Sequence, residues 1–525
     1  MDPIMVATFV ITCLLLYRVI NGAIKILRIV LWSDYPSNTE DILRLPFIGH
    51  AYFFIDGTEA LFNRAIKVGN IYSTTVRLSV GHHSVFVVTI PEHLKEVLLS
   101  PKTIEKNFCY DFGRLWLGDG LLTAPASIWE AHRKLLHPFF NSLTLKSSLE
   151  TFVTQSVTLA KKIEPHLDGP EFEISRYISL CTLDTICVAA MGINLDAQES
   201  EKCQYHEAGH KVLAGFAKRT LSPWLYPDFI FYRTQLGKDH RKHIEFLHEF
   251  VDNVIRQKKA EIARRSDQRV SADEEQDTAD ASTAEPQSLM ENLLKLSNDS
   301  KTLTDEQVRS HVDTMMVAGS DSSAITLNYL TLMLASHQDI QQKVYQELCE
   351  IFGEHVLEEE SEELHITMEV LTKMTYMERV IKETMRLFPV GPLLFRKATE
   401  DLVLGDCTVP RGSSVVLNVI GVHRNEKYWS EPLKFDPDRF LPEKIANQEP
   451  FSYLPFSGGR RNCIGIKYAM MFMKIFTTTV LRKYFLIKDK VVPVEDLRLK
   501  IDTLLRSVDP DTLRIKRRAK KYVPL

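Results

Sequence analysis

The sequence is poor in cysteine for its length and contains no closely spaced cysteine pair. Eight cysteines are spread over 525 residues, and no two of them form a C-x-x-C pair. Secreted domains that depend on disulfides carry cysteine at a much higher density, and structural zinc sites usually need the missing pair. These absences argue against a disulfide scaffold and against a structural zinc site, and they favour a reducing compartment.

The sequence also lacks an excess of charge of either sign. Its 64 basic and 68 acidic side chains leave a formal net charge of −4. This balance offers no general attraction for a polyanion, so no nucleic-acid partner is expected. We find no internal repeat, and the composition of 45% hydrophobic and 25% charged residues is typical of a globular protein.

Long apolar runs are missing except at the N-terminus. Residues 4–17 are almost all apolar, and Arg18, Lys25 and Arg28 follow them. The run is shorter than the roughly 20 residues of a comfortable membrane span, but further apolar residues extend it if Arg18 snorkels. Basic residues on the downstream side should keep the rest of the chain cytoplasmic. We predict an uncleaved membrane anchor over residues 1–32; a cleaved signal and a buried core helix are the alternatives.

Helical spacing of apolar residues dominates the rest of the chain. It predicts helices over about 128–259 and 289–388, and a final helix from Ile466. The polar, acidic segment 264–287 predicts a mobile surface loop, with a linker between two domains as the alternative.

Two shorter regions have the composition of β-strands. Residues 72–89 predict a hairpin with its turn at 81–83, and residues 402–420 form a second β-rich patch. The sequence therefore predicts a mainly α fold with small β-sheets, in which residues 33–525 form a single catalytic domain.

The most informative segment is a glycine-rich loop just before the final predicted helix. It runs from Phe456 to Gly465 as FSGGRRNCIG. Gly459 and Gly465 would let the backbone approach a flat ligand, Phe456 would form an apolar wall, and Arg461 could neutralise a carboxylate on that ligand. The helix dipole and backbone N–H groups would favour a thiolate at Cys463. A lone cysteine is usually a small core residue, but these neighbours indicate a ligand-binding one.

The pattern F-x-x-G-x-R-x-C-x-G resembles the haem loop of the cytochrome P-450 superfamily. Its five fixed residues at fixed spacing should occur by chance less than about once in ten thousand chains of this length, at average residue usage. The resemblance extends from about Leu45 onward. It implies the P-450 fold and a haem b whose iron is bound by Cys463 as the metal ligand. Such a thiolate favours O–O cleavage.

Glu383 and Arg386 lie three residues apart in a predicted helix and so share a face. Such a pair is usually a surface ion pair worth about 1 kcal/mol or less. In the resembled family, an E-x-x-R pair and a later arginine form a buried triad that holds the thiolate loop. Arg439, in the stretch PDRF, has the matching position, so the resemblance implies a structural triad of Glu383, Arg386 and Arg439.

The stretch Ala318-Gly319-Ser320-Asp321-Ser322 is expected in the middle of a helix, where glycine costs about 1 kcal/mol. One explanation is a kink in which serine hydroxyls bond back to the preceding turn. The other is a groove that admits O2, with Asp321 and Ser322 relaying protons. The family usually has threonine at position 322. Serine lacks the methyl group that restrains the hydroxyl, so we expect activity with more release of peroxide.

Trp129 and Arg133 resemble the W-x-x-x-R contact that the family makes to a haem propionate. Arg396, after a Pro/Gly break, resembles a second propionate partner. An ordinary solvated arginine is the alternative for Arg396.

The stretch His206-Glu207-Ala208-Gly209-His210 matches the H-E-x-x-H motif of zinc proteases. This would give the protein a different class of function, zinc hydrolysis. Gly209 weakens the helix that must aim both imidazoles at one metal, and no third ligand is marked by its spacing.

Residues 311–321 and 115–122 resemble the P-450 clan of the fatty-acid ω-hydroxylases (family four), which includes insect and vertebrate microsomal enzymes. Many members carry a glutamate, at the position of Ala318, that esterifies a haem methyl group. Alanine has no carboxylate, so the haem should be non-covalent, and strict terminal hydroxylation is not implied.

The resemblance implies a monooxygenase of the endoplasmic reticulum membrane that inserts one oxygen atom of O2 into a small lipophilic substrate. Fatty acids, terpenoids, hormones and xenobiotics all fit apolar walls expected at residues 312–317, 390–395 and 507–508. An isomerase or dehydratase of the same fold is the alternative within the family. It needs no proton relay, so Asp321 and Ser322 argue against it.

The chain after Cys463 is too short for a flavin or nicotinamide domain. Electrons are therefore expected from an NADPH-dependent flavoprotein reductase, and cytochrome b5 is a further candidate partner. Lys134, Arg460 and Lys467 are candidates for the docking face, with ordinary solvated charges as the alternative.

Overall fold

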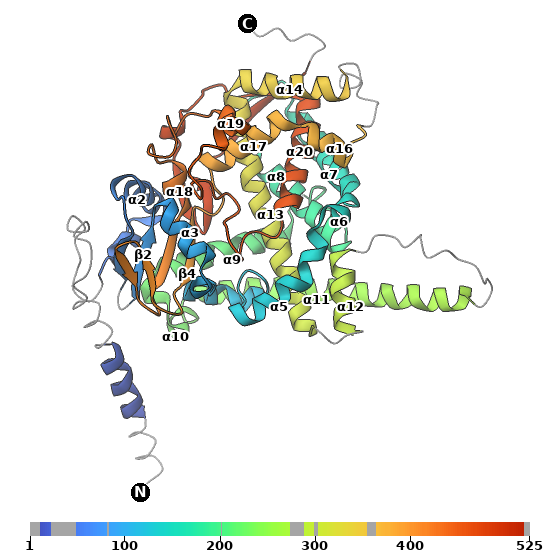
Figure 1. Cartoon of the computed structure of the whole chain (residues 1–525). Helices are drawn as coiled ribbons and strands as arrows, with labels where there is room; N and C mark the ends of the chain where they lie inside the picture. The colour runs from blue at the N-terminus through green and yellow to red at the C-terminus, as the bar shows by residue number, and fades with distance from the viewer. Residues whose placement is uncertain are drawn as a thin grey trace.

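A long helix, α13 (Asp305–Ser336), runs through the middle of the molecule (Figure 1). It begins at Thr304, which forms a capping box with Gln307. Most of its residues beyond the first two turns are buried on all sides, which is the pattern of a core helix rather than a surface one. It packs closely along α8 (Ser175–Ile186) and also contacts α17 (Thr375–Leu387).

The computed structural model describes residues 11–22, 49–80, 83–200, 202–273, 288–298, 303–353 and 364–518. Helices make up most of these residues, so the prediction of a mainly α fold is confirmed. The other α-helices with stated bounds are α2 (Gly57–Ile71), α3 (Pro91–Leu99), α4 (Arg114–Leu117), α5 (Ala126–Leu136), α6 (Ser142–Lys146), α7 (Leu149–Ile163), α9 (Gln204–Thr220), α10 (Asp228–Phe231), α11 (Gln235–Asp273), α12 (Leu289–Asn298), α14 (Gln338–Phe352), α16 (Met368–Lys373), α18 (Val419–His423), α19 (Pro442–Ile445) and α20 (Ile466–Lys483).

The largest sheet has four strands in the order β1-β2-β7-β4. These strands are β1 (Val76–Val80), β2 (His83–Val88), β7 (Ser414–Asn418) and β4 (Leu393–Lys397). The first two form the predicted hairpin, although residues 81–82 of its turn lie outside the described residues. β2 pairs with β7 in parallel, and β4 joins β7 antiparallel. The sheet therefore joins residues 76–88, near the N-terminus, to residues 393–418, which precede the thiolate loop in the sequence.

The remaining described strands form three smaller sheets. Two of these strands come from the β-rich patch predicted at residues 402–420, which is thereby confirmed. The strands are β3 (Phe172–Glu173), β5 (Leu402–Leu404), β6 (Cys407–Val409), β8 (Tyr484–Ile487), β9 (Leu499–Asp502), β10 (Leu504–Ser507) and β11 (Thr512–Arg517).

Helix α11 corrects the predicted surface loop at residues 264–287. The helix continues through Asp273, so the first part of that segment is helical (Figure 1). Alanine, glutamate and arginine around residue 264 are good helix formers, and Arg265 pairs with Glu261 one turn earlier at 2.5 Å. Residues 274–287 lie outside the described residues.

The predicted membrane anchor is described only in part. Residues 11–22 are helical, and their large apolar side chains are exposed. Among the described residues, no helix is both long enough and apolar enough to cross a membrane. Residues 1–10 and 23–32 lie outside the described residues, so the anchor stays a prediction.

Candidate active site

Cys463 lies just before α20, as predicted. Its own N–H donates to the Phe456 carbonyl at 3.0 Å, and the Gly465 N–H donates to its Sγ at 3.3 Å. The thiol is accessible to water, yet burial raises its pKa, and the Gly465 N–H and Arg133 oppose that rise. An accessible thiol that is nonetheless surrounded by protein must line an internal hollow. The predicted help from backbone N–H groups is present, but desolvation outweighs it.

The backbone and a neighbouring helix constrain Gly459. Its φ is 68°, and an added Cβ would lie 1.9 Å from the Leu98 carbonyl oxygen at the end of α3. A left-handed turn that packs against protein backbone is therefore enough to require glycine here. A Cβ at Gly465 would meet nothing nearer than Cys463 Sγ at 3.9 Å. That position remains compatible with the predicted approach.

Helix α5 contacts the thiolate loop (residues 456–465) at Arg461 and Asn462. Arg133 donates to the carbonyl oxygen and to Oδ1 of Asn462 at 3.1 and 2.9 Å. Trp129, one turn earlier, is buried, and the Arg461 guanidinium lies 4.6 Å above its ring. The predicted pair therefore does meet the loop. Arg133 contributes by fixing the loop backbone, and Trp129 by positioning Arg461 through a cation–π contact.

Three cations gather beside the loop: Lys106, Arg396 and Arg461. Burial, followed by repulsion from the other two, holds the pKa of Lys106 well below its ordinary value. Burial lowers the pKa of Arg396, and burial followed by Arg396 lowers the pKa of Arg461 to about 10. Among the residues that the structure describes, no carboxylate lies within ion-pair distance of the three, although the more distant Glu105 partly opposes the fall in the pKa of Arg461. Such a group of like charges is suited to a buried anion.

Two of these three residues were expected, and one was not. Arg396 is 3% exposed, so the alternative of a solvated arginine is wrong. Nε and Nη1 of Arg461 are buried without a hydrogen-bond partner, while its Nη2 donates to the Ala124 carbonyl at 2.8 Å. Lys106 belongs to no sequence motif. A backbone bridge to Arg396 places it in this group of cations. The unpaired donors and the summed charge fit the two propionates of a haem.

The predicted triad is assembled in the core. Glu383 and Arg386 are fully buried and joined by two hydrogen bonds of 2.7 and 2.8 Å. Arg439 Nε lies 3.3 Å from Glu383 Oε1. The remaining donors of Arg386 bind the carbonyls of His423 and Pro432, each at 2.8 Å. A buried ion pair is tolerable only with such additional partners.

The triad reaches the thiolate loop through a residue that no motif marked. The His423 Nδ1 lies 3.1 Å from the Arg386 carbonyl, and the Leu454 N–H donates to His423 Nε2 at 2.7 Å. These two contacts require a neutral ring protonated on Nδ1. Burial, followed by the charge of Arg386, lowers the pKa of His423 to about 3. Leu454 lies two residues before Phe456, so His423 fixes the start of the loop.

The centre of α13 favours the packing explanation of Gly319. A Cβ there would lie 2.7 Å from Ile186 Cδ1, so glycine is needed where α8 crosses. Ser320 and Ser322 donate to the carbonyls one turn back, each at 2.6 Å, as expected for hydroxyls that bond back to the helix. The helix is continuous here, so the predicted open groove is not formed by the backbone. Ala318, by contrast, is exposed within this buried helix.

The carboxylate of Asp321 contacts residues of β10 and α9. Arg506 donates to its Oδ2 at 2.8 Å, and His210 Nε2 lies 3.8 Å from its Oδ1. The Nε2 atoms of His206 and His210 are 3.0 Å apart on α9. Within the described residues, no group of three histidine, cysteine, aspartate or glutamate side chains is arranged to hold a metal.

Two small apolar hollows touch the predicted substrate walls. One, of about 130 Å³, is lined by Leu393 and Phe395 of β4 together with Phe108 and Tyr226. The other, of about 30 Å³, is lined in part by Met316 and Val317 of α13 and by Asp321. Two of the three predicted wall segments therefore border these hollows, whereas Ser507 of the third lines a separate hollow together with Arg498 and Asp511.

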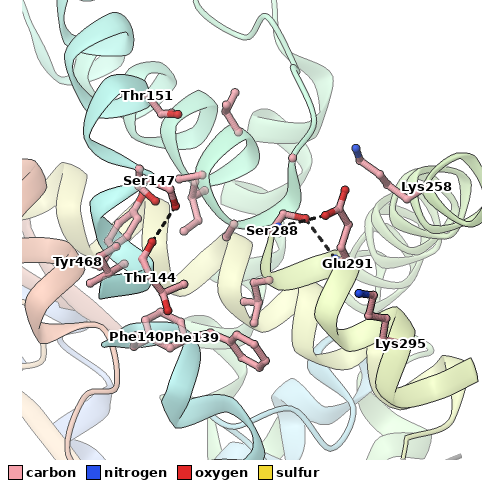
Figure 2. Close-up of a pocket in the computed structure, with 18 of the residues that line it drawn as sticks. Phe139, Phe140, Thr144, Ser147, Thr151, Lys258, Ser288, Glu291, Lys295 and Tyr468 are labelled. Atoms are coloured by element: carbon pink, nitrogen blue, oxygen red, sulfur yellow. Dashed lines mark hydrogen bonds between the residues drawn. The ribbon is translucent and has the colours of Figure 1, made fainter. Parts of the chain in front are cut away.

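A larger cavity, of about 460 Å³, lies elsewhere, among α6, α7, α11 and α12 (Figure 2). None of the predicted site residues lines it. Two of its three cations are paired: Lys258 Nζ lies 2.8 Å from Glu261 Oε2, and Arg265 Nη1 lies 3.5 Å from Glu291 Oε1. The third, Lys295, is exposed to solvent.

Comparison with known proteins decides the family. The family model described as cytochrome P450 matches residues 41–511. The chain belongs to the cytochrome P450 family. It is 34% identical to cytochrome P450 4c3 of Drosophila melanogaster over 90% of this chain and 87% of that one, and 33% identical to human cytochrome P450 4V2 over 90% and 88%. These relatives place it in the family-four clan and make it a haem-thiolate monooxygenase rather than a zinc hydrolase.

A solved structure shares the fold. The crystal structure of a mutant cytochrome P450DA heme domain matches with a TM-score of 0.75 and 20% identity, over 91% of this chain and 97% of that one. The P450 fold predicted from the loop is thereby confirmed. Like other P450 enzymes, the protein uses a haem that is held by a cysteine thiolate.

Proposed function

We propose that Cys463 is the cysteine that binds the haem iron, and that Lys106, Arg396 and Arg461 hold the haem propionates. One observation carries this assignment: an accessible thiol just before α20 lies in the same loop as Arg461, which belongs to a group of three mutually repelling cations and whose buried Nε and Nη1 have no hydrogen-bond partner. Haem, when bound there, supplies the reductive activation of O2. Ala318 offers no carboxylate to the macrocycle, so the haem is non-covalent.

The reaction inserts one oxygen atom of O2 into a lipophilic substrate, and the other oxygen leaves as water. The apolar hollow beside Phe395 supports such a substrate, of the class of fatty acids, terpenoids, hormones or xenobiotics. Apolar walls exclude water and orient a substrate that offers few polar handles.

Asp321 and Ser322 supply the protons that the departing oxygen needs. Asp321 is 8% exposed and held through one oxygen by Arg506, so its other oxygen remains available. The Ser322 hydroxyl donates to Ala318 and can accept a proton in exchange, because a hydroxyl both donates and accepts. General acids placed in this way contribute about 10²–10⁴-fold to a proton-transfer step.

The enzyme works at the cytoplasmic face of the endoplasmic reticulum membrane with a separate NADPH-dependent flavoprotein reductase, and cytochrome b5 can serve as a second donor. Exposed Trp224 and Phe229 near α10 support contact with lipid. Lys134 and Arg460 support a basic docking face, although both lie close to Glu130. Docking of this kind weakens at high ionic strength.

The experiment is turnover with the reductase, NADPH and O2 after a screen of lipophilic ligands by their spectral shift. We expect one product oxygen from O2, and we expect Asp321→Asn and Ser322→Ala to divert electrons to peroxide. Ser320→Ala is the matched control, because Ser320 also bonds back within α13. Substrate oxidation and peroxide release that stay unchanged in both relay variants would refute the relay. Conversion without NADPH or O2 would indicate the isomerase alternative.

A further inference from the structure

His206 and His210 have no part in the reaction as described so far. They lie one turn apart on α9, and their Nε2 atoms are 3.0 Å apart. The same Nε2 of His210 lies 3.8 Å from Oδ1 of Asp321 on α13. Nε2 of His210 therefore lies near both the imidazole of His206 and the carboxylate of Asp321.

We propose that His206 and His210 are the entry path by which protons from solvent reach Asp321. This inference rests on the proposed relay role of Asp321. His210 is more accessible to solvent than the carboxylate: the Asp321 side chain is 12% exposed, and that of His210 is 35% exposed. A buried carboxylate that must be recharged in every turnover needs a neighbour that can exchange protons with water, and His210 meets this need.

The charged groups around the two histidines leave Oδ1 of Asp321 free to accept a proton and favour neutral imidazole rings. Arg506 on β10 holds Oδ2 of Asp321 at 2.8 Å, which leaves Oδ1 facing His210. Burial lowers the pKa of both histidines, to about 4 for His206. Arg506 lowers both further, Arg176 on α8 and His210 lower that of His206, and Asp321 opposes these effects. Both rings are therefore mainly neutral at pH 7, and a neutral imidazole has one nitrogen that accepts a proton and one that donates.

The transfer balances without an electron moving. The N–H bond of protonated His210 breaks and an O–H bond forms at Oδ1 of Asp321. His206 then takes a proton from a solvent hydronium ion, which leaves as water, and passes a proton to Nε2 of His210, so that His206 ends neutral. Because the pKa of His206 is lowered to about 4, its ring is rarely protonated at pH 7 and carries each proton only briefly. A rotation of the His210 side chain that moves Nε2 by about 1 Å would bring it within hydrogen-bond distance of Oδ1 of Asp321.

The test uses the haem-loaded protein with His206→Gln, His210→Gln and Asp321→Asn. Glutamine keeps a hydrogen-bonding side chain of similar length but cannot pass a proton. Glu207→Gln is the matched control, since Glu207 belongs to the same turn of α9 but is exposed. Thermal unfolding and haem content are recorded for every variant, so that a folding defect is recognised.

The first readout is independent of turnover. Diethyl pyrocarbonate acylates neutral histidine, and peptide mass spectrometry gives the rate at His210 as a function of pH. Because the Asp321 carboxylate favours protonated His210, Asp321→Asn should shift the midpoint for His210 to lower pH. Exposed His137 serves as the internal reference and should not shift. An unchanged midpoint at His210 would contradict the contact.

The second readout is the share of electrons lost as peroxide, together with the solvent deuterium isotope effect, with dodecanoic acid as the probe. His210→Gln should raise the peroxide share about three- to tenfold and increase the isotope effect. This is less than the full 10²–10⁴ of a general acid, because water can partly replace the ring. Glu207→Gln should match the wild type.

The outcomes separate the two proposals. If Asp321→Asn changes neither quantity, the relay role of Asp321 is wrong and the entry path is wrong with it. If Asp321→Asn impairs both while His210→Gln behaves like Glu207→Gln, only the entry path is wrong. Loss of thermal stability in His210→Gln without a change in the isotope effect would show that the ring only packs α9 against α13.

Discussion

The Leu454 N–H donates to His423 Nε2 over 2.7 Å, and this hydrogen bond joins the buried Glu383–Arg386 pair to the thiolate loop. The triad itself binds the segment around Pro432 and Asp436 rather than the loop. Its effect on Cys463 therefore passes through His423. A shift in this ring would move the backbone two residues before Phe456.

Arg386→Ala should abolish haem incorporation. The substitution leaves Glu383 as an uncompensated buried charge, which costs about 3–5 kcal/mol, and it frees the carbonyls of His423 and Pro432. Arg379→Ala, on the same helix, removes an ion pair to Asp438 whose two side chains are both more exposed, worth about 1 kcal/mol or less. It should keep the normal Soret spectrum. A normal Soret spectrum from Arg386→Ala would refute the triad.

Lys106→Met should weaken haem binding without destabilising the haem-free protein. A lost hydrogen bond to a charged group costs about 1.5–3 kcal/mol, so haem should leave at least about tenfold faster in a transfer assay to a haem-accepting globin. In haem-free protein the change removes one of three mutually repelling cations, so the unfolding temperature should hold or rise. Lys102→Met, at an exposed partner of Glu400, is the control. Equal haem retention in the two variants would count against the propionate assignment.

Acid should destabilise the fold through buried neutral histidines. Burial lowers the pKa of His423 to about 3, below the ordinary value of about 6.5 for an unfolded chain. The unfolded chain therefore binds one more proton between these values, and stability falls as the pH drops below about 6.5, by about 1.4 kcal/mol per unit for this one proton. His423→Gln should show a shallower loss than the wild type when chemical unfolding is followed by circular dichroism between about pH 7.5 and 5. Parallel curves would mean that His423 does not stay neutral.

The haem should leave the polypeptide completely on acid–organic extraction. Ala318 is exposed on α13 but carries no carboxylate that could esterify a haem methyl group. Absorbance of the extracted and precipitated fractions measures the partition. Haem that remains with the polypeptide would mean that another side chain forms the link.

The parts of the site that could be predicted from the sequence are those in which residue type and spacing are both unusual. The loop around Cys463 and the pair Glu383–Arg386 are of this kind, and the structure assembles both as expected. Lys106 and His423 could not be predicted in this way, because their importance comes from contacts with Arg396 and Leu454 that only the folded chain creates.

Glycine positions show the same limit in another form. The sequence predicted a kink or an oxygen-admitting groove at Gly319, and backbone approach to a flat ligand at Gly459. In each case the reason is a neighbour distant in the chain, Ile186 or Leu98, which a side chain would strike. The predicted end of helix α11 came too early in the sequence. Surface loops and exposed helices share a polar composition, so composition did not reveal that the helix continues to Asp273.

The assignment of Cys463 as the axial ligand is tested most directly by the carbon monoxide difference spectrum of the reduced protein. We predict a band at the long-wavelength position of a thiolate-bound haem in the wild type, and its loss in Cys463→Ser. A wild-type band at the position of a histidine-bound haem, or a thiolate band that survives in Cys463→Ser, would contradict it.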